Sequence, residues 1–235
     1  MKIGVLAEEK ALDDKRVPLT PNQCKILLDI YPSLEISVKS SAIRCFSDEM
    51  YISNGIDIVT DLSDCNVLIG VKEVPEKSLI PNKTYFYFSH TIKAQPYNRE
   101  LLLKMLELNI SMVDYEVLKD KQGKRLLGFG RYAGIVGAYN CFLTYGLKSD
   151  KYNLKAAYSC EDSIEMEQEL AKIKLSYEKI IVTGNGRVGN GILEIMQKAN
   201  IREVSKEEFL DETFNESVFI HLSTMDYNIR KDGTF

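Results

Sequence analysis

The sequence predicts an α/β fold with two domains, each built on a largely parallel β-sheet. Along the first half of the chain, short β-branched or aromatic runs alternate with amphipathic stretches, a pattern that favours parallel strands joined by helices. A further buried, strand-like run near Lys179 leads directly into a glycine-rich loop. The chain of 235 residues contains 45% hydrophobic and 27% charged residues. This composition is typical of a globular protein with one large domain or two modest ones.

The elements of the first half follow from local signals. Thr20-Pro21 marks the start of a helix, because threonine suits the N-cap and proline is tolerated in the first turn. Leu101 and Met105 are spaced to share one buried helical face. We expect helices at residues 22–30 and after residue 96, and strands at residues 2–6, 34–38, 56–59, 66–71, 84–89 and 110–113.

The middle of the chain contains a turn and then a glycine-dotted stretch. Asp120-Lys121-Gln122-Gly123 is a turn signal, and residues 125–129 are expected to resume extended structure. Small residues three apart within residues 132–138 suit a helix that packs closely against another element, and an apolar run continues it to residue 147. We interpret this helix as the connection between the domains. Residues 161–172 are typical of a polar surface helix.

The second domain begins with a buried strand at residues 180–183, followed by an amphipathic helix at 190–199. Between them, Gly184, Gly186 and Gly189 have the G-x-G-x-x-G spacing. The first glycine permits the tight turn, the second lets a pyrophosphate approach the backbone, and the third lets the helix pack against the strand. The strand–loop–helix context favours a Rossmann-like dinucleotide site that also includes Arg187 and Val188. A glycine-rich turn without a ligand is the alternative.

Further strands are expected near residues 201–204 and 218–222. An acidic residue at the end of the strand after the loop commonly binds the ribose of NAD. Glu203 is the nearest candidate, but Ser205 could occupy the equivalent place and would remove that carboxylate. The sequence therefore predicts NAD or NADP as the cofactor without selecting between them.

Lys72 and His90 each follow a predicted strand of the first sheet. Ligand crevices in such sheets form at the carboxyl ends of the strands, so both side chains could meet in one crevice. A desolvated lysine there can donate or accept protons. A surface lysine before a turn and a structural histidine are the alternatives. His221, within the strand at 218–222, is expected to be structural.

Two arginines are placed to bind carboxylates. Arg16 lies between the first strand and the first helix, and Arg125 begins the extended segment at 125–129, with Glu116 just before the preceding turn. Arginine binds carboxylates bidentately, so both fit an amino-acid or 2-oxo-acid substrate. Solvated surface charge is the alternative for either residue.

Composition argues against several classes of partner. The net charge of −4 gives no electrostatic reason to expect nucleic acid or an anionic membrane. No apolar stretch approaches the ~20 residues needed to span a bilayer, and the apolar N-terminal run is too short for a signal peptide. Five widely spaced cysteines without a C-x-x-C pair, and only two histidines, predict reduced thiols in a cytoplasmic protein and no metal site.

Several motifs, in order along the chain, resemble a known family. The matching segments are Lys15-Arg16-Val17-Pro18-Leu19-Thr20-Pro21, Gly70-Val71-Lys72-Glu73-Val74-Pro75-Glu76, Phe88-Ser89-His90-Thr91-Ile92-Lys93-Ala94-Gln95, Asp114-Tyr115-Glu116-Val117-Leu118 and Gly128-Phe129-Gly130-Arg131-Tyr132-Ala133-Gly134. Together they resemble the lysine-forming saccharopine dehydrogenases and, more distantly, alanine dehydrogenase and the transhydrogenase nucleotide-binding subunit. The resemblance covers most of residues 1–190.

The resemblance implies roles for residues in these motifs. It implies that Lys72 and His90 form an acid–base pair. Substrate binding would fall to Arg16, Glu73, Lys93, Glu116 and Arg125. The implied activity is NAD(P)-dependent reductive amination of a 2-oxo acid with an amine, or the reverse oxidative deamination. Alanine dehydrogenase-like chemistry and non-catalytic nucleotide binding are the alternatives.

The resemblance also implies a domain plan. Residues 1–135 would form an N-terminal substrate-binding and catalytic domain. Residues 136–235 would contain the connecting helix and the start of an NAD(P)-binding Rossmann domain. Family members are longer than this chain, so we expect the second domain to be incomplete and the isolated chain to be inactive. Neither the identity of the substrate nor the oligomeric state follows from the sequence.

Overall fold

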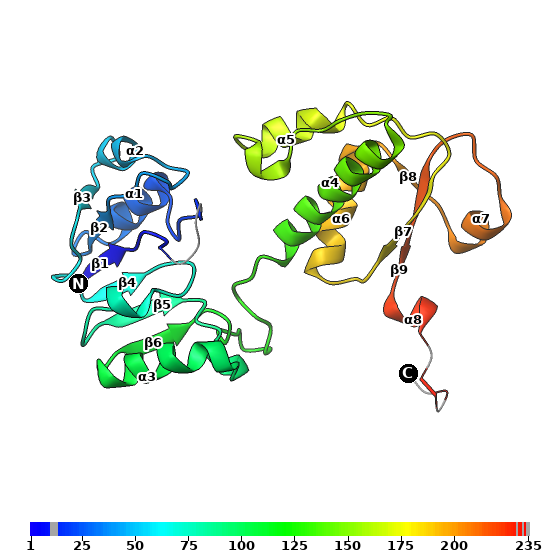
Figure 1. Ribbon diagram of the computed structural model, residues 1–235. Helices are drawn as coiled ribbons and strands as arrows, with labels where there is room; N and C mark the ends of the chain where they lie inside the picture. The colour runs from blue at the N-terminus through cyan, green and yellow to red at the C-terminus, as the bar shows by residue number, and fades with distance from the viewer. Residues whose placement is uncertain (10–13, 229, 232, 234–235) are drawn as a thin grey trace. The chain divides into compact units, whose positions relative to one another are not determined.

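The computed structural model describes residues 1–9, 14–228, 230, 231 and 233. It divides into two compact units, Met1–Gly128 and Phe129–Phe235. One unit contains a six-stranded parallel sheet and the other a three-stranded parallel sheet (Figure 1). The predicted α/β class is therefore confirmed. No helix in the described part of the chain is long and apolar enough to cross a membrane.

The first unit has the strand order β3-β2-β1-β4-β5-β6, with every pair parallel. The chain builds outward from β1 in one direction and then from β4 in the other, so the order reverses between these two strands. Open α/β sheets bind ligands beyond the carboxyl ends of their strands at such a point. The elements are β1 (Lys2–Val5), α1 (Pro21–Ile30), β2 (Glu35–Lys39), α2 (Asp48–Ile52), β3 (Asp57–Val59), β4 (Val67–Ile69), η1 (Glu76–Ser78), β5 (Thr84–Tyr87), η2 (Thr91–Lys93), η3 (Pro96–Asn98), α3 (Arg99–Glu107) and β6 (Ser111–Asp114).

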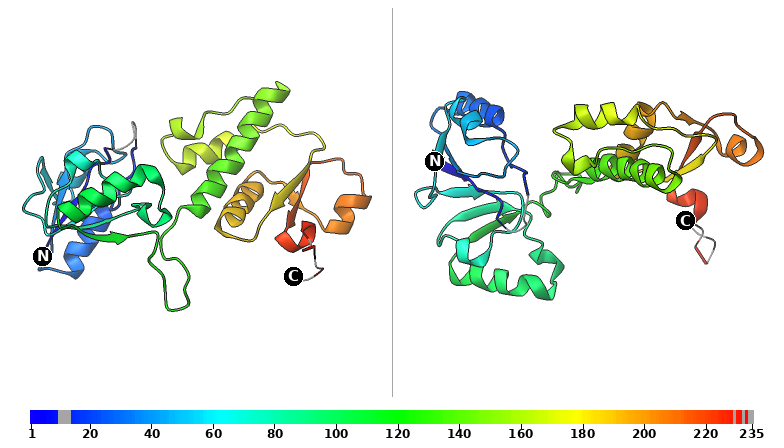
Figure 2. Two further views of the ribbon diagram at one scale, coloured as in Figure 1. Left: turned by 60° about the horizontal axis from the view of Figure 1, so that its bottom comes forward. Right: turned by 45° about the horizontal axis from the view of Figure 1, so that its top comes forward.

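Helices cover both faces of this sheet. Figures 1 and 2 show α1 and α2 on one side of the strands and α3 on the other. Each side has its own buried cluster: Val38 and Tyr51 belong to the one with α1 and α2, and Leu68 and Tyr85 to the one with α3. In β4, Leu68 belongs to one cluster and Ile69 packs against the other, so this strand is hydrophobic on both faces.

Local sequence signals in the first unit predicted its six strands and the helices α1 and α3, but they missed α2 and gave one wrong strand. Thr20 caps α1 as predicted, and Gln23 completes the capping box by accepting the Thr20 N–H at 2.9 Å. The expected strand at 125–129 is wrong: the segment forms only an isolated antiparallel bridge between Lys119 and Arg125. The turn that joins these two residues contains Gly123 at φ +77°. Residues 126–129 have no strand partner among the described residues, so they connect the units instead of extending the sheet.

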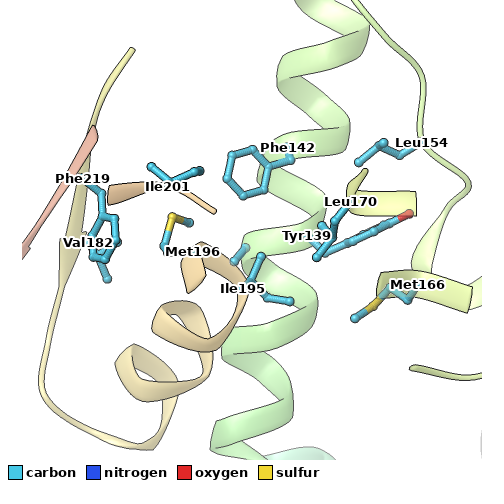
Figure 3. Close-up of a cluster of buried hydrophobic side chains, with 11 residues drawn as sticks. Tyr139, Phe142, Leu154, Met166, Leu170, Val182, Ile195, Met196, Ile201 and Phe219 are labelled. Atoms are coloured by element: carbon cyan, nitrogen blue, oxygen red, sulfur yellow. The ribbon is translucent and has the colours of Figure 1, made fainter. Parts of the chain in front are cut away.

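The second unit begins with a long helix and contains the predicted glycine loop. Its elements are α4 (Gly130–Ser149), η4 (Ala157–Ser159), α5 (Ser163–Leu170), β7 (Lys179–Thr183), α6 (Arg187–Lys198), β8 (Arg202–Glu203), α7 (Lys206–Asp211), β9 (Val218–Leu222) and α8 (Thr224–Tyr227). Figure 3 shows its core, where Tyr139 and Phe142 from α4 meet Ile195 and Met196 from α6. Phe219 of β9 packs against the same cluster, so the helices and the sheet share one core.

In the second sheet, the strand that follows the glycine loop does not lie next to the strand that precedes it. β9 lies between β7 and β8, and both of its pairings are parallel. In the common dinucleotide-binding order, the strand that follows the glycine loop lies next to the strand that precedes it. Here β9 takes that place, so neither Glu203 nor Ser205 ends a strand beside β7. Ser205 instead caps α7, where its hydroxyl accepts the Glu208 N–H at 3.2 Å.

Glycines allow α4 and α6 to cross at very short distance. A Cβ atom added to Gly134 would lie 2.0 Å from the carbonyl oxygen of Val188, and one added to Gly191 would lie 2.1 Å from that of Arg131. The backbone of α6 therefore touches α4 at Gly134, and the backbone of α4 touches α6 at Gly191. The small residues that predicted a closely packed helix are explained by this crossing.

A hydrogen-bonded carboxylate ties the end of α4 to the base of the second sheet. Glu178 precedes β7 and accepts hydrogen bonds from the Tyr145 hydroxyl, from Lys151 Nζ at 3.0 Å and from Ser217 Oγ at 2.8 Å. Partial burial opposes ionisation, but the hydrogen bonds from Tyr145, Ser217 and Lys151 outweigh it and lower the pKa of Glu178 to about 2.

The helix crossing predicts opposite effects for two glycines of α4. Gly134→Ala should lower the free energy of unfolding by about 1–3 kcal/mol, because the new methyl group forces two backbones apart. Gly137 has no atom within 4 Å of an added Cβ. Gly137→Ala should therefore raise stability by about 0.5–1 kcal/mol, the gain of alanine over glycine in a helix. Urea unfolding measures both, and equal effects of the two substitutions would contradict the crossing.

The Glu178 contacts predict a pH-dependent contribution to stability. A carboxyl group whose pKa is lowered by folding stabilises the folded state above its unfolded pKa, near 4.5, and loses that contribution as the pH falls toward 2. Glu178→Gln should therefore lower the thermal midpoint at pH 7, and its difference from wild type should shrink below pH 4.5. Glu161→Gln, at an exposed position, is the control. A difference that stays constant between pH 7 and pH 3 would refute this role.

Candidate active site

Most of the predicted site residues of the first unit lie just after the carboxyl ends of neighbouring parallel strands. Lys72 and Glu73 follow β4, His90 follows β5, and Glu116 follows β6. These three strands are adjacent in the sheet, so their following loops emerge at one edge. The structure thus places Lys72 and His90, which the sequence analysis expected after strands of one sheet, at the same edge of that sheet.

Glu8 bridges the point where the strand order reverses. It follows β1, and its carboxylate accepts the backbone N–H of Val71 at 2.7 Å and that of Lys72 at 2.8 Å. Glu8 is 7% exposed, and burial raises its pKa although the two N–H donors oppose the rise. Glu8 thus fixes the backbone from which the Lys72 side chain extends.

Glu73 holds the imidazole of His90. The Glu73 carboxylate lies 2.8 Å from His90 Nδ1, with the Glu73 side chain almost fully buried and the His90 side chain 17% exposed. A carboxylate only accepts, so Nδ1 carries the proton in this contact. When the ring is neutral, Nε2 is then the nitrogen that can accept a proton, which is the arrangement that an acid–base histidine requires.

The backbone around His90 is unusual. His90 has φ +56°, and Ala94 has φ +50°, so two non-glycine residues in the left-handed region bracket η2. This conformation costs roughly 1–2 kcal/mol for a residue with a Cβ atom. Such strain concentrates where a side chain must be presented in one direction. It supports a functional role for His90 over a purely structural one.

Charged side chains gather around Glu116. Its Oε1 lies 3.2 Å from Lys93 Nζ and 3.8 Å from an Arg125 terminal nitrogen. The Arg125 guanidinium also lies 5.9 Å from the centre of the Phe88 ring, and Phe88 stacks on His90 with the ring centres 6.4 Å apart. The predicted residues Glu73, His90, Lys93, Glu116 and Arg125 therefore form one continuous cluster through Phe88.

The cluster rests on a hydrogen-bonded base. Asp114, the last residue of β6, accepts the Ser89 hydroxyl at 2.6 Å and the Glu116 N–H at 2.8 Å. The Ser89 hydroxyl also lies 2.8 Å from that of Thr91. These contacts join the loop after β5 to the loop after β6, which places His90 and Glu116 on a common support.

Arg16 is held by a second acidic residue. Its Nε donates to Asp14 at 2.8 Å and a terminal nitrogen donates at 2.5 Å. The Arg16 hydrogen bonds lower the pKa of Asp14, and the charge of Lys72 contributes in the same direction. Glu8 is a further electrostatic neighbour of Arg16. Arg16, Asp14, Glu8 and Lys72 thus form a charged group beside β1 and β4.

The predicted glycine loop has the form of an anion cradle. Gly184 adopts φ +91°, a conformation that favours glycine, and an added Cβ at Gly184 or Gly186 would meet open space. A Cβ at Gly189 would lie 1.7 Å from the Gly184 carbonyl oxygen, so only glycine fits there. Gly186 is the N-cap of α6, and as a glycine it has no side chain to cap the helix. A loop of this form at the start of α6, with Arg187 and Val188 in the first turn of the helix, is a candidate site for the pyrophosphate of a dinucleotide.

Sequence reasoning missed several residues that support this site. Glu8, Asp14 and Asp114 bind backbone or arginine groups of the predicted site residues. Tyr115 packs on Phe88 with ring centres 5.3 Å apart, and burial followed by the nearby charge of Glu8 raises the pKa of Tyr115 to about 12. Glu8 could have been found from its place just after the first strand, where an acidic residue follows a buried run.

The Glu8 bridge predicts a measurable loss of stability. Glu8→Ala should lower the free energy of unfolding by about 1–3 kcal/mol, because it leaves the Val71 and Lys72 N–H groups without their acceptor. Glu8→Gln should cost less, since one acceptor oxygen remains. Glu9→Ala removes a neighbouring glutamate that pairs with Lys39 and Ser78, and its cost should stay below about 1 kcal/mol. If urea unfolding gives Glu8→Ala the same free energy of unfolding as Glu9→Ala, the Glu8 bridge does not stabilise the fold.

Comparisons with known proteins agree with these features. The family model described as alanine dehydrogenase/PNT, N-terminal domain, matches residues 4–136. The alpha-aminoadipic semialdehyde synthase of Arabidopsis thaliana is 34% identical over 217 residues, which cover 83% of this chain and 20% of that protein. The saccharopine dehydrogenase (NAD(+), L-lysine-forming) of Candida albicans is 31% identical over 222 residues, covering 83% of this chain and 57% of that protein.

A solved structure supports the fold. An L-alanine dehydrogenase aligns with a TM-score of 0.64 at 17% identity and covers 96% of this chain and 62% of that chain. This chain therefore spans less than two thirds of each of these proteins. The resemblance drawn from the motifs is confirmed by the family match over the first unit. The chain belongs to the alanine dehydrogenase/PNT N-terminal domain family.

Proposed function

We propose that the protein containing this chain is an NAD(P)-dependent amino-acid dehydrogenase of the saccharopine dehydrogenase type. The observation that carries this proposal is the cluster of Glu73, His90, Lys93, Glu116 and Arg125 at the carboxyl edge of three parallel strands. Relatives that align with most of this chain are named for saccharopine chemistry, which favours a saccharopine-type substrate over alanine.

In the proposed reaction, a 2-oxo acid and an amine are joined reductively, or the product is cleaved oxidatively. NAD(P) supplies or accepts the hydride at the carbon that bears nitrogen. Formation and hydrolysis of the carbon–nitrogen double bond require proton transfers to oxygen and nitrogen. His90 has Nε2 available for such a transfer because Glu73 holds Nδ1. Lys72, whose backbone Glu8 holds, is the second acid–base group.

Positive charge in the same region suits carboxylate substrates. Lys93 and Arg125 both lie near the carboxylate of Glu116, and among the described residues no donor reaches the buried Glu116 Oε2. A substrate carboxylate would pair with Lys93 and Arg125, and a substrate ammonium group would donate to Glu116. Arg16 is proposed as a further carboxylate-binding residue, because its planar fork suits bidentate recognition.

The glycine loop is proposed to bind the pyrophosphate of the cofactor through Gly184, Gly186, Arg187, Val188 and Gly189. The proposal covers both NAD and NADP, because the pyrophosphate is common to them. An alanine dehydrogenase-like activity is the second candidate, and the structural similarity to an L-alanine dehydrogenase is the observation that favours it.

The proposal is tested by NADH and NADPH oxidation in the complete protein that contains this chain. Turnover with 2-oxoglutarate plus lysine would establish saccharopine-type chemistry, and turnover with pyruvate plus ammonia would establish the alanine type. Binding of NADH without turnover of either pair would contradict the saccharopine proposal and favour a non-catalytic nucleotide-binding protein.

The acid–base assignment is tested by Lys72→Met. Loss of a general acid–base group should lower kcat by about 100-fold or more, while the affinity for NADH stays within about twofold. Lys77→Met is the matched control, because Lys77 is an exposed lysine of η1 in the same segment and should leave kcat unchanged. Near-wild-type turnover in Lys72→Met would remove Lys72 from the mechanism.

A further inference from the structure

His221 contacts the backbone of the glycine loop. It lies on β9, opposite Val182 of β7 in the parallel register, and its ring is partly buried. His221 Nε2 lies 3.0 Å from the carbonyl oxygen of Gly184. A carbonyl oxygen can only accept, so Nε2 must be the protonated nitrogen. The contact therefore fixes both the tautomer and the orientation of the ring.

β9 holds both backbone polar groups of the first loop glycine. The Gly184 N–H donates to the carbonyl oxygen of Leu222 at 2.8 Å, and the Gly184 carbonyl accepts from the side chain of His221, the preceding residue of β9. The first of these bonds continues the pairing of β7 with β9. The second lies outside the regular ladder and depends on the identity of one side chain.

The Gly184 carbonyl is confined on another side by the third glycine of the loop. Its oxygen lies so close to Gly189 that an added Cβ there would be 1.7 Å away. The carbonyl group is thus held between the His221 ring and the first turn of α6. It cannot rotate without breaking the His221 hydrogen bond or displacing that helix turn.

The direction of this carbonyl sets the direction of the next N–H group. No peptide bond among the described residues is cis, and in a planar trans peptide the C=O and the following N–H point in opposite directions. When His221 draws the Gly184 oxygen toward β9, the Asn185 N–H must point away from that contact. Rotation of this peptide would turn the Asn185 N–H the other way and place a carbonyl oxygen in its position.

We infer that His221 is a positioning residue for dinucleotide binding: its Nε2–H holds the Gly184 carbonyl and thereby keeps the Asn185 N–H directed to the cofactor pyrophosphate. This inference rests on the proposed binding of NAD(P) at the loop. A rotated Gly184–Asn185 peptide would present an oxygen where an N–H is needed, and an anion would then be repelled instead of bound.

The test compares two variants of the complete protein that contains this chain. His221→Leu removes the donor, whereas His221→Gln keeps an N–H donor on a side chain of similar reach. Thermal unfolding first establishes that both variants fold. Backbone ¹⁵N relaxation of the ligand-free proteins then reports the motion of residues 184–189, and titration with NADH reports affinity. We expect His221→Leu to show new exchange at Asn185 and to bind NADH about tenfold more weakly, the effect of one hydrogen bond. His221→Gln should restore both to within about threefold.

Each outcome supports or overturns the positioning role of His221. If His221→Leu binds NADH as wild type does, or if His221→Gln is no better than His221→Leu, the positioning role is overturned. Failure of the complete wild-type protein to bind NADH would count against the proposed function of the loop. The relaxation data would then test the positioning role of His221 separately. Loop motion that appears in His221→Leu and is suppressed in His221→Gln supports that role, and unchanged motion in His221→Leu overturns it.

Discussion

The candidate site in the first unit depends on the hydrogen bonds that Glu8 makes beside β1 and β4, where the strand order reverses. Just beyond β1 the Leu6 N–H still donates to the Ile69 carbonyl oxygen at 2.8 Å. The N–H groups of Val71 and Lys72, which follow β4, instead donate to the Glu8 carboxylate. A buried carboxylate is costly unless it is fully hydrogen-bonded, and here the two donors come from the segment that must be held. The bridge therefore converts an irregular edge into a fixed support for the proposed acid–base lysine.

The rest of the site is organised by shared carboxylates. Glu73 holds one nitrogen of His90, Asp114 supports the loops after β5 and β6, and Glu116 lies between Lys93 and Arg125. Glu116 contacts two cations with one carboxylate, whereas Glu73 serves His90 alone. The left-handed backbone at His90 fixes the direction in which its ring is presented.

In the first unit, carboxylates hold the loops of the candidate site in place. In the second unit, close contacts between backbones hold the glycine loop in place. Gly134 and Gly191 let α4 and α6 cross, and Gly189 lets the Gly184 carbonyl pass against the start of α6. The loop is thus fixed from the helix side by the absence of side chains and from the sheet side by His221. Both constraints act on the same carbonyl group. The orientation of the loop amides then follows from peptide planarity.

The sequence by itself determined the fold class, the glycine loop and most members of the candidate site, because periodicity, helix caps and motif spacing are local properties. It also placed Lys72 and His90 after neighbouring strands. Only the tertiary structure decided that β9 lies beside β7 and that residues 125–129 form no strand. Strand order and pairing depend on contacts between distant segments, which no local pattern encodes. The supporting roles of Glu8 and His221 were hidden for the same reason: each acts on a backbone group more than 30 residues away.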